Sequence, residues 1–577
     1  MRNFITGILF FILCTPGVSG QDRLLDLLKR EISHQMQELQ QQELPPYYMN
    51  YRMVDEYATR ITTAFGVLMD DTYKHERTLV PQIRIGSKEF DNFKKRAMGC
   101  KITFWEGPSY AVLPLDENNN ENAIRQAIWQ EVNSRYKFAV EMYQQAKASM
   151  KINVEEDDKS PCFSEAPIET YYEEPLPDAQ LHINREAWIK RLKEISAVFQ
   201  NQPKLLEGEA YLQYIVKRIY FIDTDGTAVV QNQTRARILV SGMTKADDGM
   251  KLPLSLSYFA YRPEDLPSNE QIIAETQQLV KKLLELREAP IVEPYTGPAI
   301  LSGASGGVFF HEIFGHRIEG QRMKEEDDAQ TFKTMVGKPV LPADMQVYAD
   351  PTLKEYAGEK LNGHYKYDDQ GVKAQRVDVV VDGKLNEFLM TRTPLDGHPR
   401  SNGHARAALG YDPTSRQSNL IVETKDPKSE AELRRMLIAE AKAQGKEYGY
   451  FFKEVTGGFT MTGRMMANSF NVIPVEVYEI YVDGRPDRLV RGVDLIGTPL
   501  SMFSNIIHAG GESQVFTGTC GADSGGVPVT ATSPTILVKK VEMQKQDKSA
   551  DLPPILEKPL FTREKCMVKL LFYFFVF

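Results

Sequence analysis

Hydrophobic and polar residues alternate along much of the N-terminal half, which is the pattern of half-buried β-strands. The alternating stretches are residues 48–54, 58–68, 73–85, 207–240 and 251–261. Met69-Asp70-Asp71 separates two of these runs in the manner of a turn, and Asp223-Thr224-Asp225-Gly226 is typical of a hairpin turn. The sequence therefore predicts antiparallel strands, joined by turns, before residue 261.

Other segments repeat their apolar residues at the spacing of an amphipathic helix. They are residues 22–42, 118–152, 183–200, 267–287 and 429–442. In the last of them, Ser429 is followed three residues later by Glu432, which predicts a capping box at the start of that helix. The proline- and glutamate-rich residues 155–178 have no such period, so they are predicted to form a loop or a boundary.

Shorter strands are predicted in the C-terminal half, interrupted by loops and helices. The predicted strands are residues 299–302, 366–381, 385–391, 418–423, 459–462, 470–482, 489–492 and 534–543. We expect a small-residue loop at 303–307, a further helix at 500–508 and a loop at 517–523. The expected fold class is α+β, because mostly antiparallel strands occur with segregated helices.

The length of 577 residues favours more than one domain. The expected parts are a signal peptide at 1–20, an N-terminal α+β region at 21–117, a central α+β region at 118–290, a C-terminal domain at 291–545 and a tail at 546–577. The C-terminal domain is expected to be mostly antiparallel β. The tail is predicted to be disordered, since it begins with a charged, proline-rich stretch.

The first twenty residues indicate export. Arg2 precedes the apolar residues 5–13, and Val18-Ser19-Gly20 offers small residues before a cleavage near Gln21. The apolar run is too short to span a bilayer comfortably, so a signal peptide is favoured over a membrane anchor. Cys14 leaves open a lipoprotein, but Leu13 stands where a small residue is expected. The predicted location is periplasmic or secreted.

Charge and cysteine content narrow the picture further. A net charge of −9 argues against nucleic acid as the main partner. In an oxidising compartment Cys100 and Cys162 are the pair to consider for a disulfide, and two free thiols are the alternative.

The candidate chemistry lies in the stretch from Gly306 to Gly320, which contains the adjacent His311 and Glu312, followed by His316. Two imidazoles suit zinc, and a neighbouring carboxylate can act as a general base. The alternative is a helix end with two exposed histidines. A spacing of five residues turns the two side chains roughly 140° apart on a regular α-helix. Sharing one metal would therefore require a π-type or broken turn near Gly315.

Several motifs together resemble the TldD/PmbA family of metallopeptidases. They are Gly297-Pro298, His311-Glu312-x-x-Gly315-His316-x-x-Glu319-Gly320, Tyr367-Asp368-Asp369-x-Gly371 with Gln375-Arg376, Ser401-Asn402-Gly403, Asn419, and Thr517-Gly518-Thr519-Cys520-Gly521 with Val527-Pro528-Val529. The resemblance is clear from residue 297 to residue 542 and looser before it. It implies that His311, His316 and Cys520 hold one zinc ion and that Glu312 is the catalytic base. It also implies peptide substrates and a site enclosed by paired chains, either two copies or this chain with a related metal-less one.

The expected function is that of a zinc-dependent peptidase acting on small or unfolded peptides, with Glu312 activating a zinc-bound water. The alternatives are an exported zinc amidase acting on modified peptides and an inactive metal-binding partner subunit. Glu319 either orients a ligand histidine or forms a helix-end salt bridge. His404 and His508 are candidates for oxyanion stabilisation or for structural roles. Three further residues match family positions and either bind substrate or support loops: Arg376, Asn402 and Asn419.

Overall fold

The structure is a computed structural model that describes residues 22–94, 109–116, 121–150, 158–325, 328, 330–463 and 470–546. The predicted signal peptide, Cys100 and the tail beyond residue 546 lie outside the described residues. Helices and strands make up 26% and 43% of the structure, so the predicted α+β class is confirmed.

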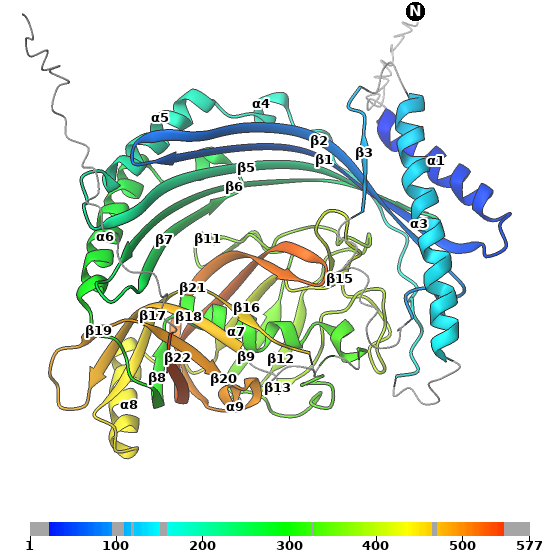
Figure 1. Ribbon diagram of the computed structural model, residues 1–577. Coiled ribbons are helices and arrows are strands. Elements are labelled where there is room, and N and C mark those ends of the chain that lie inside the picture. Colours follow the sequence, from blue (N-terminus) through cyan, green and yellow to red (C-terminus); the bar gives the residue numbers. More distant parts are fainter. Residues whose placement is uncertain are drawn as a thin grey trace, which may run out of the picture.

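A seven-stranded sheet occupies the N-terminal half and arches over the rest of the molecule (Figure 1). Its strand order is β3 (Ala111–Leu113), β2 (Val67–Ile85), β1 (Pro46–Ala64), β5 (Leu205–Asp223), β6 (Ala228–Lys245) and β4 (Thr170–Tyr172), and β7 (Lys251–Ala260) also pairs with β6. Neighbouring strands are antiparallel except β4 and β6. Residues 21–117 and 118–290 therefore contribute strands to the same sheet.

The three alternating runs before residue 86 are two long strands, which corrects the predicted turn at Met69-Asp70-Asp71. The chain turns instead at Phe65 and Gly66, both of which have positive φ. Asp70 and Asp71 lie inside β2, paired with β1. This end of β2 is largely exposed, so its polar residues remain in water and do not end the strand. The hairpin predicted at Asp223–Gly226 is confirmed between β5 and β6.

In the part of the chain that the structure describes, four helices cover the face of this sheet that points away from the C-terminal half. Helices α1 (Arg23–Leu39) and α3 (Glu121–Met150) pack on one end, and α5 (Arg185–Ser196) and α6 (Asn269–Glu288) on the other (Figure 1). The predicted helices are thus confirmed, and α1, α5 and α6 each begin at a side chain that caps the helix: Asp22, Asn184 and Ser268. The short helix α4 (Asp178–Leu181) lies between α3 and α5 in the sequence.

An eleven-stranded, mostly antiparallel sheet forms the C-terminal half. Its strands are β8 (Tyr295–Leu301), β9 (Met345–Ala349), β12 (Val377–Val381), β13 (Lys384–Leu385), β16 (Asn419–Thr424), β17 (Tyr448–Thr460), β18 (Phe470–Tyr481), β19 (Arg488–Val490), β20 (Val493–Gly497), β21 (Ile506–Ala522) and β22 (Gly525–Lys545). Two small sheets consist of β10 (Glu355–Tyr356) with β11 (Glu359–Lys360), and of β14 (Ala405–Arg406) with β15 (Thr414–Ser415). Strand β22 is central, because it pairs with β8, β16, β20 and β21.

Among the described residues of this half there are three α-helices: α7 (Gly303–Ile313), α8 (Glu430–Ala443) and α9 (Pro499–Phe503). The capping box of α8 at Ser429 and Glu432 is confirmed. The loop predicted at 303–307 is wrong, because these residues form the first turns of α7. Its glycines allow a close approach to β22, since a Cβ on Gly307 would lie 2.8 Å from the carbonyl oxygen of Ala531.

Two further expectations are corrected near the chain's last hairpin. The helix expected at 500–508 ends at Phe503, and the loop expected at 517–523 belongs to β21 through Ala522. β21 pairs with β22 along most of its length, and this pairing stabilises a strand with few large apolar residues.

The strand expected at 366–381 forms only at Val377–Val381, and that at 385–391 is limited to β13. In the first case Asp368 intervenes, because Oδ1 accepts hydrogen bonds from the backbone N–H groups of Gln370 and Val372 and Oδ2 from that of Ala405. A side chain that binds nearby backbone amides competes with strand pairing.

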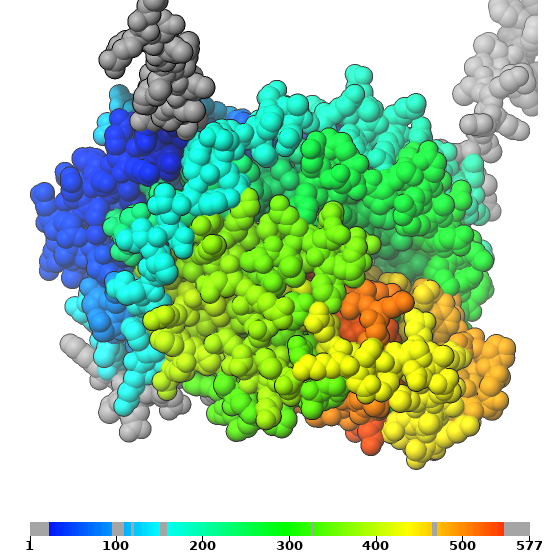
Figure 2. Space-filling model, turned by 180° about the vertical axis from the view of Figure 1, so that it is seen from behind, coloured from blue at the N-terminus to red at the C-terminus, as the bar shows by residue number. Residues whose placement is uncertain are grey.

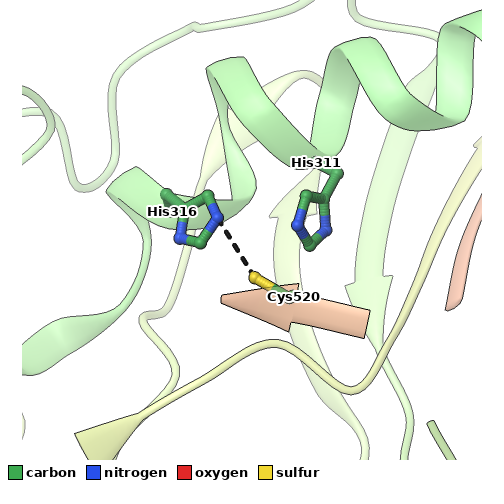
Figure 3. Close-up of side chains that lie close together, drawn as sticks. All are labelled: His311, His316 and Cys520. Carbon is green, nitrogen blue, oxygen red and sulfur yellow. Dashed lines mark hydrogen bonds between the residues drawn. The ribbon is translucent and has the colours of Figure 1, made fainter. Parts of the chain in front are cut away.

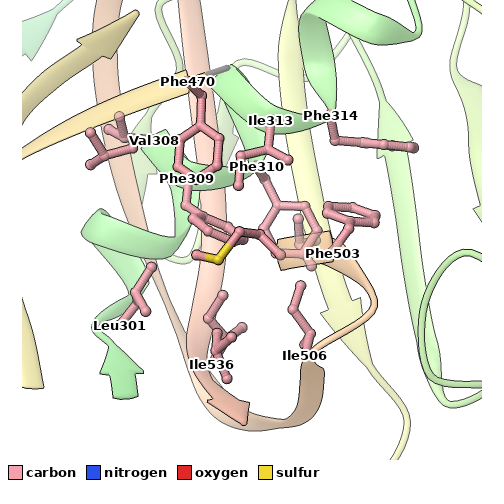
Figure 4. Packing of buried hydrophobic residues seen from close by; sticks show 14 of the residues in the cluster. Leu301, Val308, Phe309, Phe310, Ile313, Phe314, Phe470, Phe503, Ile506 and Ile536 are labelled. Carbon is pink, nitrogen blue, oxygen red and sulfur yellow. The ribbon is translucent and has the colours of Figure 1, made fainter. Parts of the chain in front are cut away.

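The main apolar core of the C-terminal half surrounds α7 (Figure 4). Phe310 and Phe314 pack against Phe503 with ring centroids 5.2 and 4.8 Å apart, and Phe309 packs against Phe470 at 5.9 Å. All three phenylalanines, two in α7 and Phe314 directly after it, are fully buried. The core thereby fixes the position of α7.

The two halves of the chain are in direct contact and form one continuous surface (Figure 2). Arg52 of β1 donates hydrogen bonds to the carbonyls of Ala408 and Tyr411, and Arg392 forms an ion pair with Asp225 of the β5–β6 turn. Within the described residues, no helix is both long enough and apolar enough to cross a membrane.

Candidate metal centre

Helix α7 carries the two histidines to a break in the helix. The helix ends at Ile313, Phe314 has φ −111° and ψ −50°, and a 3₁₀ turn follows over Gly315–Arg317. The predicted interruption between His311 and His316 is therefore present. It is a tighter 3₁₀ turn and not the wider π-type turn. Arg317 completes the helix end, because its Nη1 donates hydrogen bonds to the carbonyls of Glu312 (2.8 Å) and Ile313 (3.1 Å).

This break and the β21 strand bring His311, His316 and Cys520 together (Figure 3). Their potential ligand atoms all lie within 4.8 Å of one another, and Cys520 Sγ is 3.2 Å from His316 Nε2. The two imidazole rings are 5.0 Å apart and nearly perpendicular. All three side chains are buried. Residues from two segments more than 200 positions apart thus converge on one point.

The donor set fits a zinc ion. Two imidazoles and one thiolate are three protein ligands of the kind found at catalytic zinc, where a fourth position stays open. His311 Nδ1 is also buried without a hydrogen-bond partner among the described residues, although such atoms normally have one. A metal ion at the cluster would give the histidine pair a common partner.

The charges of the cluster favour the thiolate form of Cys520. Burial alone would raise the pKa of the thiol, but His316 and His311 outweigh it and hold the pKa of Cys520 well below its usual value. Burial likewise opposes a charged imidazole, yet the charges of Cys520 and Glu319 raise the pKa of His316 to about 10. The thiolate is the form of cysteine that binds metals.

Glu312 lies next to His311 on α7 and is also buried. Its side chain fits beneath Gly458 of β17, where a Cβ would lie 2.8 Å from Glu312 Cγ. Burial raises the pKa of Glu312, while the nearby charges of His311 and His316 lower it. Burial is the larger effect, so the pKa of Glu312 is raised, and a carboxylate with a raised pKa is a better acceptor of a proton.

Residues 294–545 match the family model described as the PmbA/TldA metallopeptidase C-terminal domain. Curated relatives agree with this match. The chain is 23% identical over 327 residues to a metalloprotease of Methanothermobacter thermautotrophicus, covering 55% of this chain and 65% of that protein. It is 22% identical to a Haemophilus influenzae protein named metalloprotease TldD homolog, covering 59% and 67%. The C-terminal half of the chain, residues 294–545, belongs to the TldD/PmbA family.

Solved structures of proteins from other organisms have a similar fold. TldE from Thermococcus kodakarensis superimposes with a TM-score of 0.60 at 12% identity, covering 90% of this chain and 100% of that chain. A Thermotoga maritima protein described as a putative modulator of a DNA gyrase gives a TM-score of 0.59 at 13% identity, with the same coverage. At these identities the likeness shows the shared fold alone.

Glu319 is almost completely buried beside the cluster. Its Oε2 lies 3.2 Å from His316 Nδ1 and 2.8 Å from Arg322 Nε. Glu319 therefore contacts His316 and forms an ion pair with Arg322, and its role in orienting a metal ligand stays a prediction. Burial opposes its charge, but His316 and Arg322 lower the pKa of Glu319 to about 2.

Arg416 links Glu319 to the cysteine hairpin and is not suggested by any sequence motif. Its Nε lies 3.6 Å from Glu319 Oε1, and its Nη2 donates a hydrogen bond of 2.5 Å to the carbonyl of Cys520. Gln417 likewise reaches the site, with Nε2 3.3 Å from the carbonyl oxygen of His311. Both side chains come from a segment whose pattern signals nothing about the metal centre.

The remaining candidates lie outside the His311–His316–Cys520 cluster. His404 is fully buried, with Nε2 3.2 Å from Ser418 Oγ, and burial lowers its pKa to about 3. The side chains of Asn402 and Asn419 form hydrogen bonds with the backbone of neighbouring loops. The guanidinium of Arg376 lies 3.6 Å from the ring centre of Tyr348, and His508 is half-buried in β21. These contacts are structural. Cys162 is buried, Cys100 lies outside the described residues, and the pairing of these two cysteines stays a prediction.

Proposed function

We propose that this chain is a zinc-dependent peptidase that hydrolyses small or unfolded peptides. The observation that carries the proposal is the convergence of His311, His316 and Cys520, together with a buried carboxylate, Glu312, directly after His311 on α7. The metallopeptidase family of its relatives supports the same reaction.

The three clustered side chains would hold the metal, and Glu312 would handle the proton. Zinc in such a site polarises a carbonyl and acidifies water. Glu312 accepts a proton at its carboxylate from the attacking water and passes it to the leaving nitrogen. The amide bond can then break with a neutral amine as the leaving group. Glu319 orients the imidazole of His316 through Nδ1.

Burial of the reacting groups favours flexible substrates. Glu312 is 7% exposed, and the three candidate ligands are between 5% and 8% exposed. A peptide bond in a folded protein cannot reach groups at this depth, which leaves short or unfolded chains as the proposed substrates.

The test measures zinc content and peptide hydrolysis in four variants. His311→Ala, His316→Ala and Cys520→Ala are expected to lose stoichiometric zinc, because each removes one of three ligands. Glu312→Gln is expected to keep zinc and lose turnover. His508→Ala is the matched control, since His508 lies on the same strand as Cys520 but outside the cluster.

Three outcomes would contradict parts of the proposal. Full zinc occupancy in Cys520→Ala would remove the cysteine from the site. Unchanged turnover in Glu312→Gln would remove its role as base. Wild-type protein that binds zinc but cleaves no peptide would identify an inactive subunit that needs a partner chain.

A further inference from the structure

One strand of the arched sheet presents arginines to the half of the molecule that holds the metal cluster. Successive side chains of a strand point to opposite faces, so Gln231, Gln233, Arg235 and Arg237 of β6 share one face. Gln231 Nε2 donates a hydrogen bond of 2.9 Å to the carbonyl of Tyr367. Farther along the strand, Arg237 Nη1 lies 3.3 Å from the carbonyl oxygen of Thr517. Arg235 lies between these two contacts and therefore faces the C-terminal half.

A third arginine approaches from the C-terminal half itself. Arg406 of β14 is buried, its Nη1 donates a hydrogen bond of 2.6 Å to the carbonyl of Gln417, and its guanidinium lies 5.0 Å from the ring centre of Tyr365. Burial and then the charge of Arg406 lower the pKa of Arg235 to about 10. The charge of the Cys520 thiolate is close enough to Arg406 to raise the pKa of its guanidinium, against the lowering effect of burial. The arginines of the two halves thus lie near one another and near the metal cluster.

These three positive charges lack a negative partner within the described residues. None of them has a carboxylate within 4.0 Å there, in contrast to Arg322 and Arg416, which both meet Glu319. The charge of Asp369 raises the pKa of Arg235 and Arg406 from farther away. Its carboxylate, however, already forms an ion pair with Arg52 at 3.4 Å and accepts a hydrogen bond of 2.8 Å from the backbone N–H of Ala407. A desolvated charge without a partner is costly, so such groups mark places where a ligand supplies the opposite charge.

We infer that Arg235, Arg237 and Arg406 bind a carboxylate of the peptide substrate, from its C-terminus or an acidic side chain. The inference rests on the proposed peptidase function. Guanidinium groups suit carboxylates because they offer paired N–H donors.

The distance to the metal cluster sets where the peptide is cut. Arg237 contacts Thr517, which is three residues before Cys520 on β21. At about 3.4 Å per residue, the two positions are roughly 10 Å apart along the strand. An extended substrate covers about 3.3–3.6 Å per residue, so the bound carboxylate lies about three residues from the cleaved bond.

The experiment compares matched peptides on the zinc-loaded protein. One unstructured hexapeptide is supplied as the free acid and as the C-terminal amide. A second pair of amides carries Asp or Asn three residues from the end. We expect kcat/KM for the free acid, or for the Asp peptide, to exceed that of its neutral partner by about tenfold or more. Mass spectrometry should place the cut within about three residues of the carboxylate.

Variants then assign the preference to the arginines. Arg235→Gln and Arg237→Gln should lower kcat/KM for the carboxylate peptides alone and bring the ratio close to one, while Arg237→Lys should keep part of it. Arg262→Gln is the control, because Arg262 follows β7, is exposed and pairs with Glu264. Circular dichroism and thermal unfolding confirm that each variant is folded.

The two proposals fail in different ways. If the wild-type protein cleaves all four peptides equally, or if the arginine variants slow both members of a pair alike, the carboxylate site is refuted and the peptidase stands. If no peptide is cleaved, binding of the same peptides to zinc-loaded Glu312→Gln decides the inference. Tenfold tighter binding of the carboxylate peptide supports it, and equal binding refutes it.

Discussion

Replacing Gly315 with alanine tests whether the 3₁₀ turn, and not the ligands alone, determines metal binding. A Cβ at this position would lie 1.9 Å from Gln417 Oε1, 2.2 Å from Cδ and 2.6 Å from Nε2. An ordinary contact begins at 3.4 Å, so the two groups must separate by about 1.5 Å. Gln417 is fully buried, so its amide group has to move within the packed interior.

The magnitude follows from this overlap. Overpacking in a filled interior costs typically 1–3 kcal/mol. Alanine also restricts the unfolded chain, which offsets about 0.4–1 kcal/mol, so we expect a net loss of about 1–2 kcal/mol. Metal ligands must be placed within about 0.2 Å, and His316 is the next residue along the turn. We therefore expect zinc affinity to fall about 10–100-fold, as it does when a residue that supports a ligand is lost.

Two measurements check this expectation: denaturant unfolding of the metal-free protein and zinc competition with a chelator. In a Gln417→Ala background the overlapping atoms are gone, so the added Gly315→Ala change should cost less than about 0.5 kcal/mol. Gly521→Ala is the matched control, because Gly521 adjoins Cys520 and a Cβ there meets nothing within 4 Å. Equal losses in both backgrounds, or unchanged zinc affinity in Gly315→Ala, would refute the reasoning.

Two other substitutions separate metal binding from proton transfer. Glu319→Gln removes the carboxylate that His316, Arg322 and Arg416 share, so zinc affinity measured by chelator competition should fall about 10–100-fold, and an unchanged affinity would deny Glu319 its orienting role. Gly458→Ala places a Cβ 2.8 Å from both Glu312 Cγ and the carbonyl oxygen of Asn471, so kcat should drop at least about tenfold while zinc stays bound, and a variant that instead loses its zinc would contradict this separation.

Local pattern was sufficient for part of the site and for much of the fold. His311, Glu312 and His316 lie within six residues, so their chemistry and the need for an interrupted helix could be read from spacing alone. The long strands and amphipathic helices of the N-terminal half follow from periodicity in the same way.

The rest depends on contacts between distant segments. Cys520 lies 204 residues after His316, and only the family resemblance pointed to it. Arg416 and Gln417 reach the centre through tertiary packing, which no local spacing encodes. Strand β21 was missed because glycines and threonines fill it where apolar residues would mark a strand, and its pairing with β22 stabilises it.

The order of the proposed ligands along the chain also determines when, during synthesis, the protein can become a hydrolase. During synthesis both histidines and Glu312 emerge first, and Cys520 follows 204 residues later. At about 5–20 residues per second, this interval lasts roughly 10–40 s. Throughout it the growing chain is itself an unfolded peptide, the kind of substrate proposed here. Because the last proposed ligand arrives on the penultimate strand, a partial chain has only two of the three proposed metal ligands and cannot assemble the full centre beside its own unfolded segments.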